Sequence, residues 1–141
     1  MYMKIKVVTP NGRIFESDIA ESITLPTESG VITIKEGHVP MMSLIAPGEV
    51  VVIEGNGSEH ALAISKGSLQ INKDNSVNVL ADTAERAEEI DVERAEEARK
   101  KAIELRVQAE SEANVNYAAL QAKIEKELAR VEVGKKWKNF K

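Results

Sequence analysis

The sequence predicts an α+β fold, in which an antiparallel β-sandwich or barrel over residues 1–84 is followed by an antiparallel two-helix hairpin over residues 85–141. All four prolines and seven of the eight glycines lie in residues 1–84. These residues punctuate short strands, and a long segment almost free of them favours helices. Charge changes at the same place: residues 1–84 hold 6 basic and 10 acidic residues, whereas residues 85–141 hold 13 of each.

Short alternating runs predict the strands of the first part. They lie at residues 4–7, 22–25, 31–34, 50–53, 61–64, 69–71 and 77–80. Turn residues separate them, and Asn11-Gly12 predicts a hairpin turn in which both residues take positive φ. About eight strands at this spacing indicate an antiparallel sandwich or barrel.

Helix signals follow at the change in composition. Asp82, three residues before Glu85, is typical of a capping-box helix start, and Asp91 offers a second N-cap. Small residues recur at helical spacing at Ala95, Ala98, Ala102, Ala109 and Ala113, and a second apolar stripe follows at Tyr117, Leu120, Ile124, Leu128 and Val131. The polar segment 111–116 between the two stripes predicts a turn, and therefore an antiparallel hairpin.

An alanine-lined hairpin is marginally stable alone. Burying a methyl group contributes about 0.8 kcal/mol, whereas ordering a residue costs about 1–2 kcal/mol of backbone entropy. We therefore expect the hairpin to lie on the β domain, on a partner, or on each in turn.

Composition excludes several functional classes. The chain has no cysteine, so disulfides, thiolate metal sites and cysteine nucleophiles are excluded. A net charge of −4 argues against nucleic acid as a partner. No run approaches the roughly 20 apolar residues that span a bilayer, so direct membrane insertion is not expected. The N-terminus does not read as a secretory signal, which predicts a cytoplasmic protein.

The sequence gives no set of convergent catalytic groups. Of the two histidines, His60 in the polar stretch 58–60 is interpreted as a solvated strand residue, and His38 as a structural or interface residue of a loop. Neither a metal-ligand spacing nor a glycine-rich phosphate loop is present. We therefore predict a protein without catalytic residues and without a metal.

Three blocks of sequence point to a family. They are residues 7–12 (VVTPNG) with Phe15, residues 37–41 (GHVPM) followed by Leu44 and Pro47-Gly48, and residues 79–91 (VLADTAERAEEID) ending in Arg94-Ala95. In this order, before an alanine-rich hairpin, they resemble the epsilon subunit of the bacterial F-type ATP synthase. The likeness covers almost the whole chain.

The resemblance implies a non-catalytic rotor subunit of the central stalk, peripheral on the cytoplasmic face of the cell membrane. The β-sandwich would contact the gamma subunit and the c-ring. The hairpin would either fold down on the sandwich or extend toward the alpha/beta catalytic head and restrain ATP hydrolysis. A free-standing adaptor or chaperone that grips clients between helices and barrel is the alternative.

Two sets of site residues follow from the resemblance. The loop residues Gly37, His38 and Pro40 match a partner-facing loop, and Met41 and Met42 would add apolar contact there or else pack in the core. A charged contact to the ring at position 31 is not expected, because the family's Gly-Glu-Leu-Gly is here residues 30–33 (GVIT).

The second set concerns a regulatory ATP, the one cofactor that the resemblance suggests. Residues 90–95 (IDVERA) match the motif by which some members bind ATP in the folded-down hairpin. The tentative nucleotide-binding residues are Glu85, Asp91, Arg94, Lys126 and Arg130. Lysines at positions 101 and 126 stand where binders carry arginine, and they lose its bidentate fork. The alternative is that Asp91 caps the helix and Arg94 is solvated.

The basic tail, residues 135–141 (KKWKNFK), has two readings. It is either a frayed end, or it docks on acidic segments of the catalytic head by charge steering and an aromatic anchor.

Overall fold

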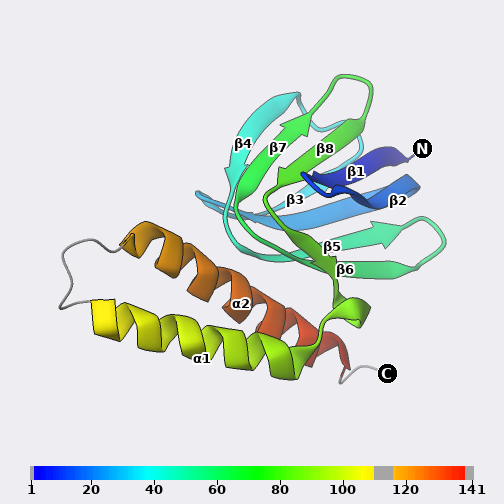
Figure 1. Cartoon of the computed structure of the whole chain (residues 1–141). Helices are drawn as coiled ribbons and strands as arrows, with labels where there is room; N and C mark the ends of the chain where they lie inside the picture. Colours follow the sequence, from blue (N-terminus) through cyan, green and yellow to red (C-terminus); the bar gives the residue numbers. More distant parts are fainter. Residues whose placement is uncertain (1, 110–115, 139–141) are drawn as a thin grey trace.

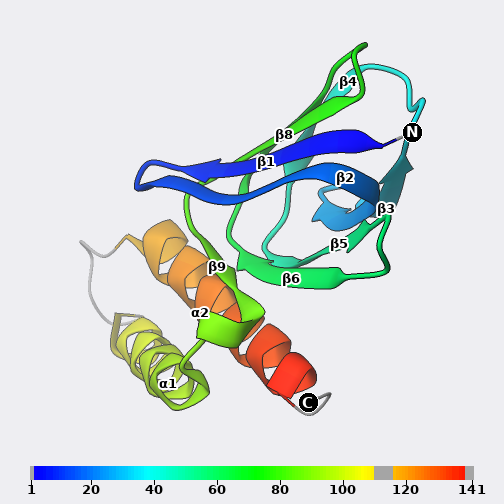
Figure 2. The ribbon, with the colours of Figure 1, turned by 90° about the vertical axis from the view of Figure 1, so that its right-hand side faces the viewer.

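The computed structural model describes residues 2–109 and 116–138 and confirms the predicted fold class: a β-sandwich is followed by two helices. Figure 1 shows the β domain on one side and the antiparallel helix pair beneath it. Helix α2 lies between α1 and the sheet in both Figure 1 and Figure 2. Helix α1 is therefore held to the β domain chiefly through α2.

Nine strands are present in the described residues. They are β1 Met3–Thr9, β2 Gly12–Thr27, β3 Gly30–Lys35, β4 Met41–Ile45, β5 Gly48–Glu54, β6 Glu59–Ile64, β7 Gly67–Ile71, β8 Ser76–Ala81 and β9 Ala84–Arg86. Strand β2 is long enough to pair with β1 along its first half and with β3 and β5 along its second half. It thus joins the two layers of the sandwich.

The sheet departs from the expected all-antiparallel pairing at one place. Strands β1 and β8 run parallel, with Ile5 opposite Val77 and Val7 opposite Val79. A parallel pair needs a long crossover connection, and here the whole intervening chain provides it.

The first hairpin forms where the sequence predicts it, but not with the expected turn. Thr9 pairs with Gly12, and Gly12 has a φ of 118°. Asn11 does not take positive φ, and among the described residues other than glycine only Asn75 does so, at 65°. Pro10 and Asn11 therefore occupy the turn, and glycine alone supplies the left-handed residue.

Strand β9 corrects the predicted helix start. The Asp82–Glu85 spacing does not begin a helix, because Ala84–Arg86 pairs with β6, with Glu85 opposite Ala63. The short 3₁₀ helix η1 (Ala87–Glu89) follows. The boundary predicted between residues 84 and 85 therefore falls inside a strand of the sheet.

The second helix start lies where it is predicted. Helix α1 spans Val92–Ala109, and Asp91 Oδ1 accepts a hydrogen bond from the backbone N–H of Arg94 at 3.2 Å. Helix α2 spans Tyr117–Lys138, and Asn116 Oδ1 accepts one from Ala119 N–H at 3.0 Å. Both side chains act as N-caps.

The two predicted stripes form the contact between the helices only in part. Ala95, Ala102, Ile124 and Val131 are buried, whereas Tyr117 is exposed. Ala98, Leu120 and Leu128 are half-buried. The side chain of Ala109, together with Ala113, lies outside the described residues.

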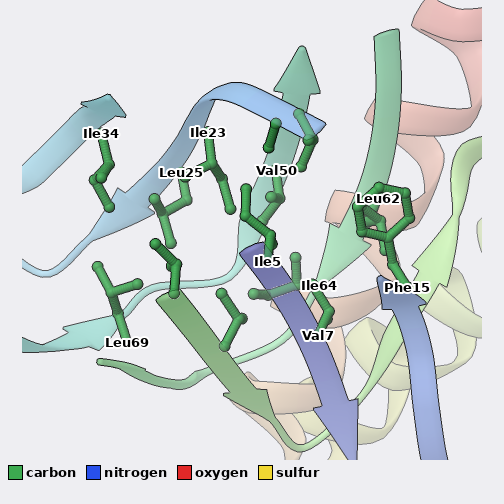
Figure 3. Packing of buried hydrophobic residues seen from close by; sticks show 14 of the residues in the cluster. Ile5, Val7, Phe15, Ile23, Leu25, Ile34, Val50, Leu62, Ile64 and Leu69 are labelled. Carbon is green, nitrogen blue, oxygen red and sulfur yellow. The ribbon is translucent and has the colours of Figure 1, made fainter. Parts of the chain in front are cut away.

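The core of the β domain is independent of the helices. Alternate strand residues such as Ile5, Val7, Leu62, Ile64 and Leu69 are buried and point into one space between the layers (Figure 3). As described, this cluster contains no residue of α1 or α2.

Candidate functional site

The interface between α2 and the sheet is lined by small side chains. Ala61 and Ala63 project from β6 on the face opposite to Leu62 and Ile64, because successive strand residues point to opposite faces. They form a separate buried cluster with Ala87, Ile90 and Val133, against which Val92 and Trp137 pack. We call this cluster the seam. Its alanines bury little apolar area, so it holds α2 weakly.

An ion-pair network crosses the interface beside the seam. Arg130 of α2 donates to Glu85 of β9, from Nε to Oε2 at 2.7 Å and from Nη2 to Oε1 at 3.3 Å. Its Nη1 donates to Glu127 Oε2 at 2.8 Å. Burial alone would lower the pKa of Arg130, but the hydrogen bonds that it donates to the two carboxylates outweigh burial and raise that pKa.

Glu127 is the buried member of the network, with 3% of the residue exposed. A buried carboxylate is tolerated where a cation and hydrogen bonds compensate it. Its second neighbour is Lys126, whose Nζ lies 4.0 Å from Glu127 Oε1. The two cations and two carboxylates therefore balance each other in charge.

A cavity of about 290 Å³ lies over this network. Ala63, Ile64, Thr83, Ala84, Glu85, Lys126 and Arg130 line it. This volume is near the lower end of the roughly 300–1,000 Å³ found for ligand pockets. A second cavity, of about 550 Å³, shares Thr83 and Lys126 with the first and extends toward Lys66 and Lys123.

The structure brings together three of the five predicted nucleotide-binding residues. Glu85, Lys126 and Arg130 line the smaller cavity. Asp91 and Arg94 do not line either cavity. Asp91 caps α1, and the side chain of Arg94 is 84% exposed with its Nε 3.9 Å from Asp91 Oδ2.

The C-terminal end of α2 makes a second set of polar contacts with the sheet. Glu49 of β5 accepts a hydrogen bond from Trp137 Nε1 at 2.9 Å on Oε2 and one from Lys136 Nζ at 2.9 Å on Oε1. Lys135 pairs with Glu96 of α1 and lowers the pKa of that carboxyl group through their hydrogen bond. Residues 139–141 of the basic tail lie outside the described residues.

The predicted partner-facing loop is a turn that leads into a strand. The backbone N–H of Gly37 donates to Asn75 Oδ1 at 3.1 Å, and Gly37 has a φ of 82°, which favours glycine. His38 is half-buried and its Nδ1 lies 2.8 Å from the carbonyl oxygen of Val39. Pro40 is exposed and ends the loop.

Met41 and Met42 lie in β4 and on opposite faces of it. Met41 packs against the core, whereas Met42 is 74% exposed. The two readings of this pair, core packing and surface contact, thus divide between the two residues.

His60 corrects one interpretation. It is not a solvated strand residue: it is half-buried, its Nε2 lies 2.5 Å from Glu54 Oε1, and its ring centre is 5.1 Å from that of Phe15. Ser17 Oγ donates to Glu54 Oε2 at 2.6 Å. The bond from Ser17 is the main cause of the lowered pKa of Glu54, which His60 lowers further against the opposing effect of burial.

Sequence reasoning missed Glu127 and Glu49. Glu127 carries a signal, since it follows Ile124 by three residues and therefore falls within the apolar stripe of α2, where an acid needs a partner. Glu49 carries none, because its partner Trp137 is 88 residues away.

Two kinds of feature are absent from the described residues. No group of three or more His, Asp or Glu side chains there is placed to hold a metal ion. No helix in the same part of the chain is long and apolar enough to cross a bilayer.

Comparison with known proteins decides the family. The family described as ATP synthase, delta/epsilon chain, β-sandwich domain, matches residues 2–87. The chain belongs to the epsilon-subunit family of the ATP synthases. The ATP synthase epsilon chain of Macrococcus caseolyticus is 35% identical over 133 residues, which cover 94% of this chain and 96% of the relative. That of Anoxybacillus flavithermus is 41% identical over 107 residues, 76% and 77% of the two chains.

Chains in solved structures of ATP synthases share the fold. One chain of the Euglena gracilis mitochondrial ATP synthase (OSCP/F1/c-ring) superposes with a TM-score of 0.71 at 23% identity, covering 93% of this chain and 79% of that one. A chain of the Tetrahymena thermophila central stalk/c-ring gives a TM-score of 0.61 at 14% identity, covering 97% and 96%. The family model and the epsilon-chain relatives favour an ATP synthase subunit over a free-standing adaptor.

Proposed function

We propose that this epsilon subunit is a non-catalytic rotor element of the central stalk, on the cytoplasmic face of the cell membrane. Its β-sandwich links the gamma subunit to the c-ring, and its hairpin restrains ATP hydrolysis when it leaves the sheet and reaches the alpha/beta catalytic head. Two observations support the place in the central stalk. The chain belongs to the epsilon-subunit family, and its structural neighbours come from stalk and c-ring complexes.

The observation that supports a mobile hairpin is the contrast between two clusters. The seam buries little apolar area, whereas the core of the β domain is packed without the helices. The core cluster has no helix residue in the part of the chain that is described. Lifting the hairpin would expose the alanines of β6 and a few larger side chains, and it would leave the sandwich packed. Elements that move are drawn from such low-stability contacts.

The turn at Gly37 and His38, with the exposed Met42 beside it, is the surface that we assign to the stalk partners. It presents apolar area, with Val39 at 69% and Met42 at 74% exposure. Methionine adapts to irregular partner surfaces.

Truncation tests the division of roles. Removing residues 92–141 keeps β9 and η1, and we expect the truncated subunit to assemble and to support ATP synthesis. ATP hydrolysis by the purified complex should rise, because the restraining element is gone. Loss of assembly would contradict the proposal, since the β domain is assigned all of the stalk contacts.

We further propose that the folded-down hairpin binds ATP as a regulatory ligand at the smaller cavity, with Lys126 and Arg130 facing the phosphates. Arg130 already has two carboxylate partners, whereas the ion pair of Lys126 within residues 2–109 and 116–138 is the 4.0 Å contact with Glu127. Lys126 is therefore the cation more available to a phosphate. The neutral total charge of the network predicts weak binding.

The test is an ATP titration of the full chain, followed by NMR. Lys126→Ala should weaken binding about tenfold or more, the loss of one charge-assisted contact, and Lys126→Arg should strengthen it by restoring a planar fork. Arg94→Ala tests whether the exposed motif arginine takes part. Lys100→Ala, on the far helix, is the matched control. If ATP changes NMR chemical shifts only at residues away from positions 85 and 126–130, the proposed site is refuted.

A further inference from the structure

We propose that Glu49 is a latch that fastens the C-terminal end of α2 to the sheet and so sets the balance between the folded-down and released hairpin. One carboxylate receives two donors from consecutive residues of α2: Trp137 Nε1 on Oε2 and Lys136 Nζ on Oε1, each at 2.9 Å. Charge-assisted bonds of this kind are the stronger class of hydrogen bond.

The latch joins residues that are far apart in the sequence. Glu49 lies in β5 and its partners lie 87 and 88 residues later, in the last described turn of α2. The Lys136 ammonium also lies 5.9 Å from the centre of the Trp137 ring. It is thus placed between a carboxylate and an aromatic face, both of which favour a cation.

The surrounding packing requires α2 to sit close at this level. A Cβ on Gly134 would come within 2.6 Å of Val92 Cγ2 and 3.1 Å of Ile90 Cγ2. Val133, one residue earlier, is buried in the seam. The end of α2 is therefore held between β5 and β6 on one side and the start of α1 on the other. The latch supplies the polar contacts of this packed end.

The ion pair of the latch is partly exposed to solvent and can therefore open. The Glu49 side chain is 25% exposed and that of Lys136 is 52% exposed, so water can replace the ion pair at modest cost. Lys136 and Trp137 also belong to the basic, aromatic tail, and a group bound to Glu49 cannot contact an acidic surface elsewhere. Glu49 thus competes, within the chain, with any acidic partner of the tail.

Trp137 reports on the latch directly, because it is the one tryptophan of the sequence. In the isolated full chain, we expect Glu49→Ala to shift Trp137 emission to longer wavelength and to increase its quenching by acrylamide. Amide exchange over residues 129–137 should rise about tenfold or more, as expected for losing hydrogen bonds to a charged group. Glu49→Gln keeps one acceptor oxygen, and its effect should be intermediate.

Glu132→Ala is the matched control. Glu132 lines the same cavity as Glu49 and Lys136 but has no ion pair or hydrogen bond with either of them. It should leave emission and exchange unchanged, and amides of β5 should stay protected in every variant. Equal effects of Glu49→Ala and Glu132→Ala would overturn the proposal.

A charge exchange provides the second test. Glu49→Lys should open the latch, and adding Lys136→Glu should restore part of the protection by reversing the ion pair. If the double variant exchanges as fast as Glu49→Lys alone, the pair with Lys136 contributes nothing and the latch is wrong.

The effect of the latch on ATP hydrolysis rests on the proposed function. A latch demonstrated in the isolated chain without any change in hydrolysis by the complex would therefore count against that function and not against the latch.

Discussion

Arg130→Ala is expected to release the hairpin, and the structure says why the effect should be large. The guanidinium contacts both Glu85 on the sheet and Glu127 on α2. Its removal leaves Glu127 buried beside a lysine whose Nζ is 4.0 Å away. The folded-down state then holds a nearly uncompensated charge, whereas the released state exposes Glu127 to water.

The magnitude follows from the burial of each partner. Removing one member of a buried ion pair costs about 3–5 kcal/mol, and the nearby Lys126 places this case at the lower end of that range. The Glu85 contact is worth about 0.5–1 kcal/mol, because that side chain is 29% exposed. Arg130→Ala should therefore destabilise the folded-down state by about 3 kcal/mol and Glu85→Ala by about 1 kcal/mol, which correspond to more than a hundredfold and about a fivefold change in the opening equilibrium.

The assay is amide exchange across α2, with the strands as the internal reference. Exchange in α2 should become much faster in Arg130→Ala while the strands remain protected. The double variant Arg130→Met with Glu127→Leu should recover most of the protection, because replacing a buried pair by apolar groups is often neutral or stabilising. The reasoning is refuted if Arg130→Ala and Glu85→Ala behave alike, or if the double variant is as open as Arg130→Ala.

Two further perturbations test other parts of the fold. Glu54→Gln should lower the free energy of unfolding at pH 7, since Ser17 and His60 favour the ionised form. Because the folded-state pKa of Glu54 is lowered, its contribution is present above the unfolded pKa of about 4.3 and disappears as the pH falls through the folded pKa. Thermal melts of the two proteins should therefore converge in acid, and a constant difference down to pH 2 would contradict the assignment. Gly134→Ala should favour the released hairpin, because a Cβ would clash with the start of α1 while alanine stabilises a free helix by about 1 kcal/mol; slower exchange in α2 would count against this packing.

The sequence predicts the elements whose signals are local. The change in glycine and proline content separates strands from helices, and Asp91 marks the start of α1 with its own side chain. The alternation of Ile5 and Val7 predicts both β1 and the face that it buries. Each of these signals lies within a few residues of the structure that it specifies.

The errors occur where distant pairing decides the outcome. Strand β9 has three residues, too few to show a period, and its pairing with β6 overrides the helix-like spacing of Asp82 and Glu85. Strand β4 follows Pro40 and reads Met-Met-Ser-Leu-Ile, which does not alternate. The candidate site divides in a related way: Glu85, Lys126 and Arg130 are named from the family resemblance, whereas the pairing of Arg130 with Glu85 on β9 follows only from the tertiary fold.

The distribution of charge across the interface argues that separation is part of its design. Glu127 and Arg130 are both on α2, three residues apart, so the buried ion pair travels with the helix when the hairpin leaves. Glu85 remains on the sheet, held by the backbone pairing of β9. Release therefore breaks the contacts of Arg130 with Glu85 and of Glu49 with α2, which lie between partly exposed groups that water can satisfy, together with the packing of the seam. An interface meant to be permanent would gain from placing the buried acid and its cation on opposite sides, where parting them would leave an unpaired charge. Here the buried ion pair lies on one element, and the polar contacts that cross the interface are those that water can replace at a low cost in free energy.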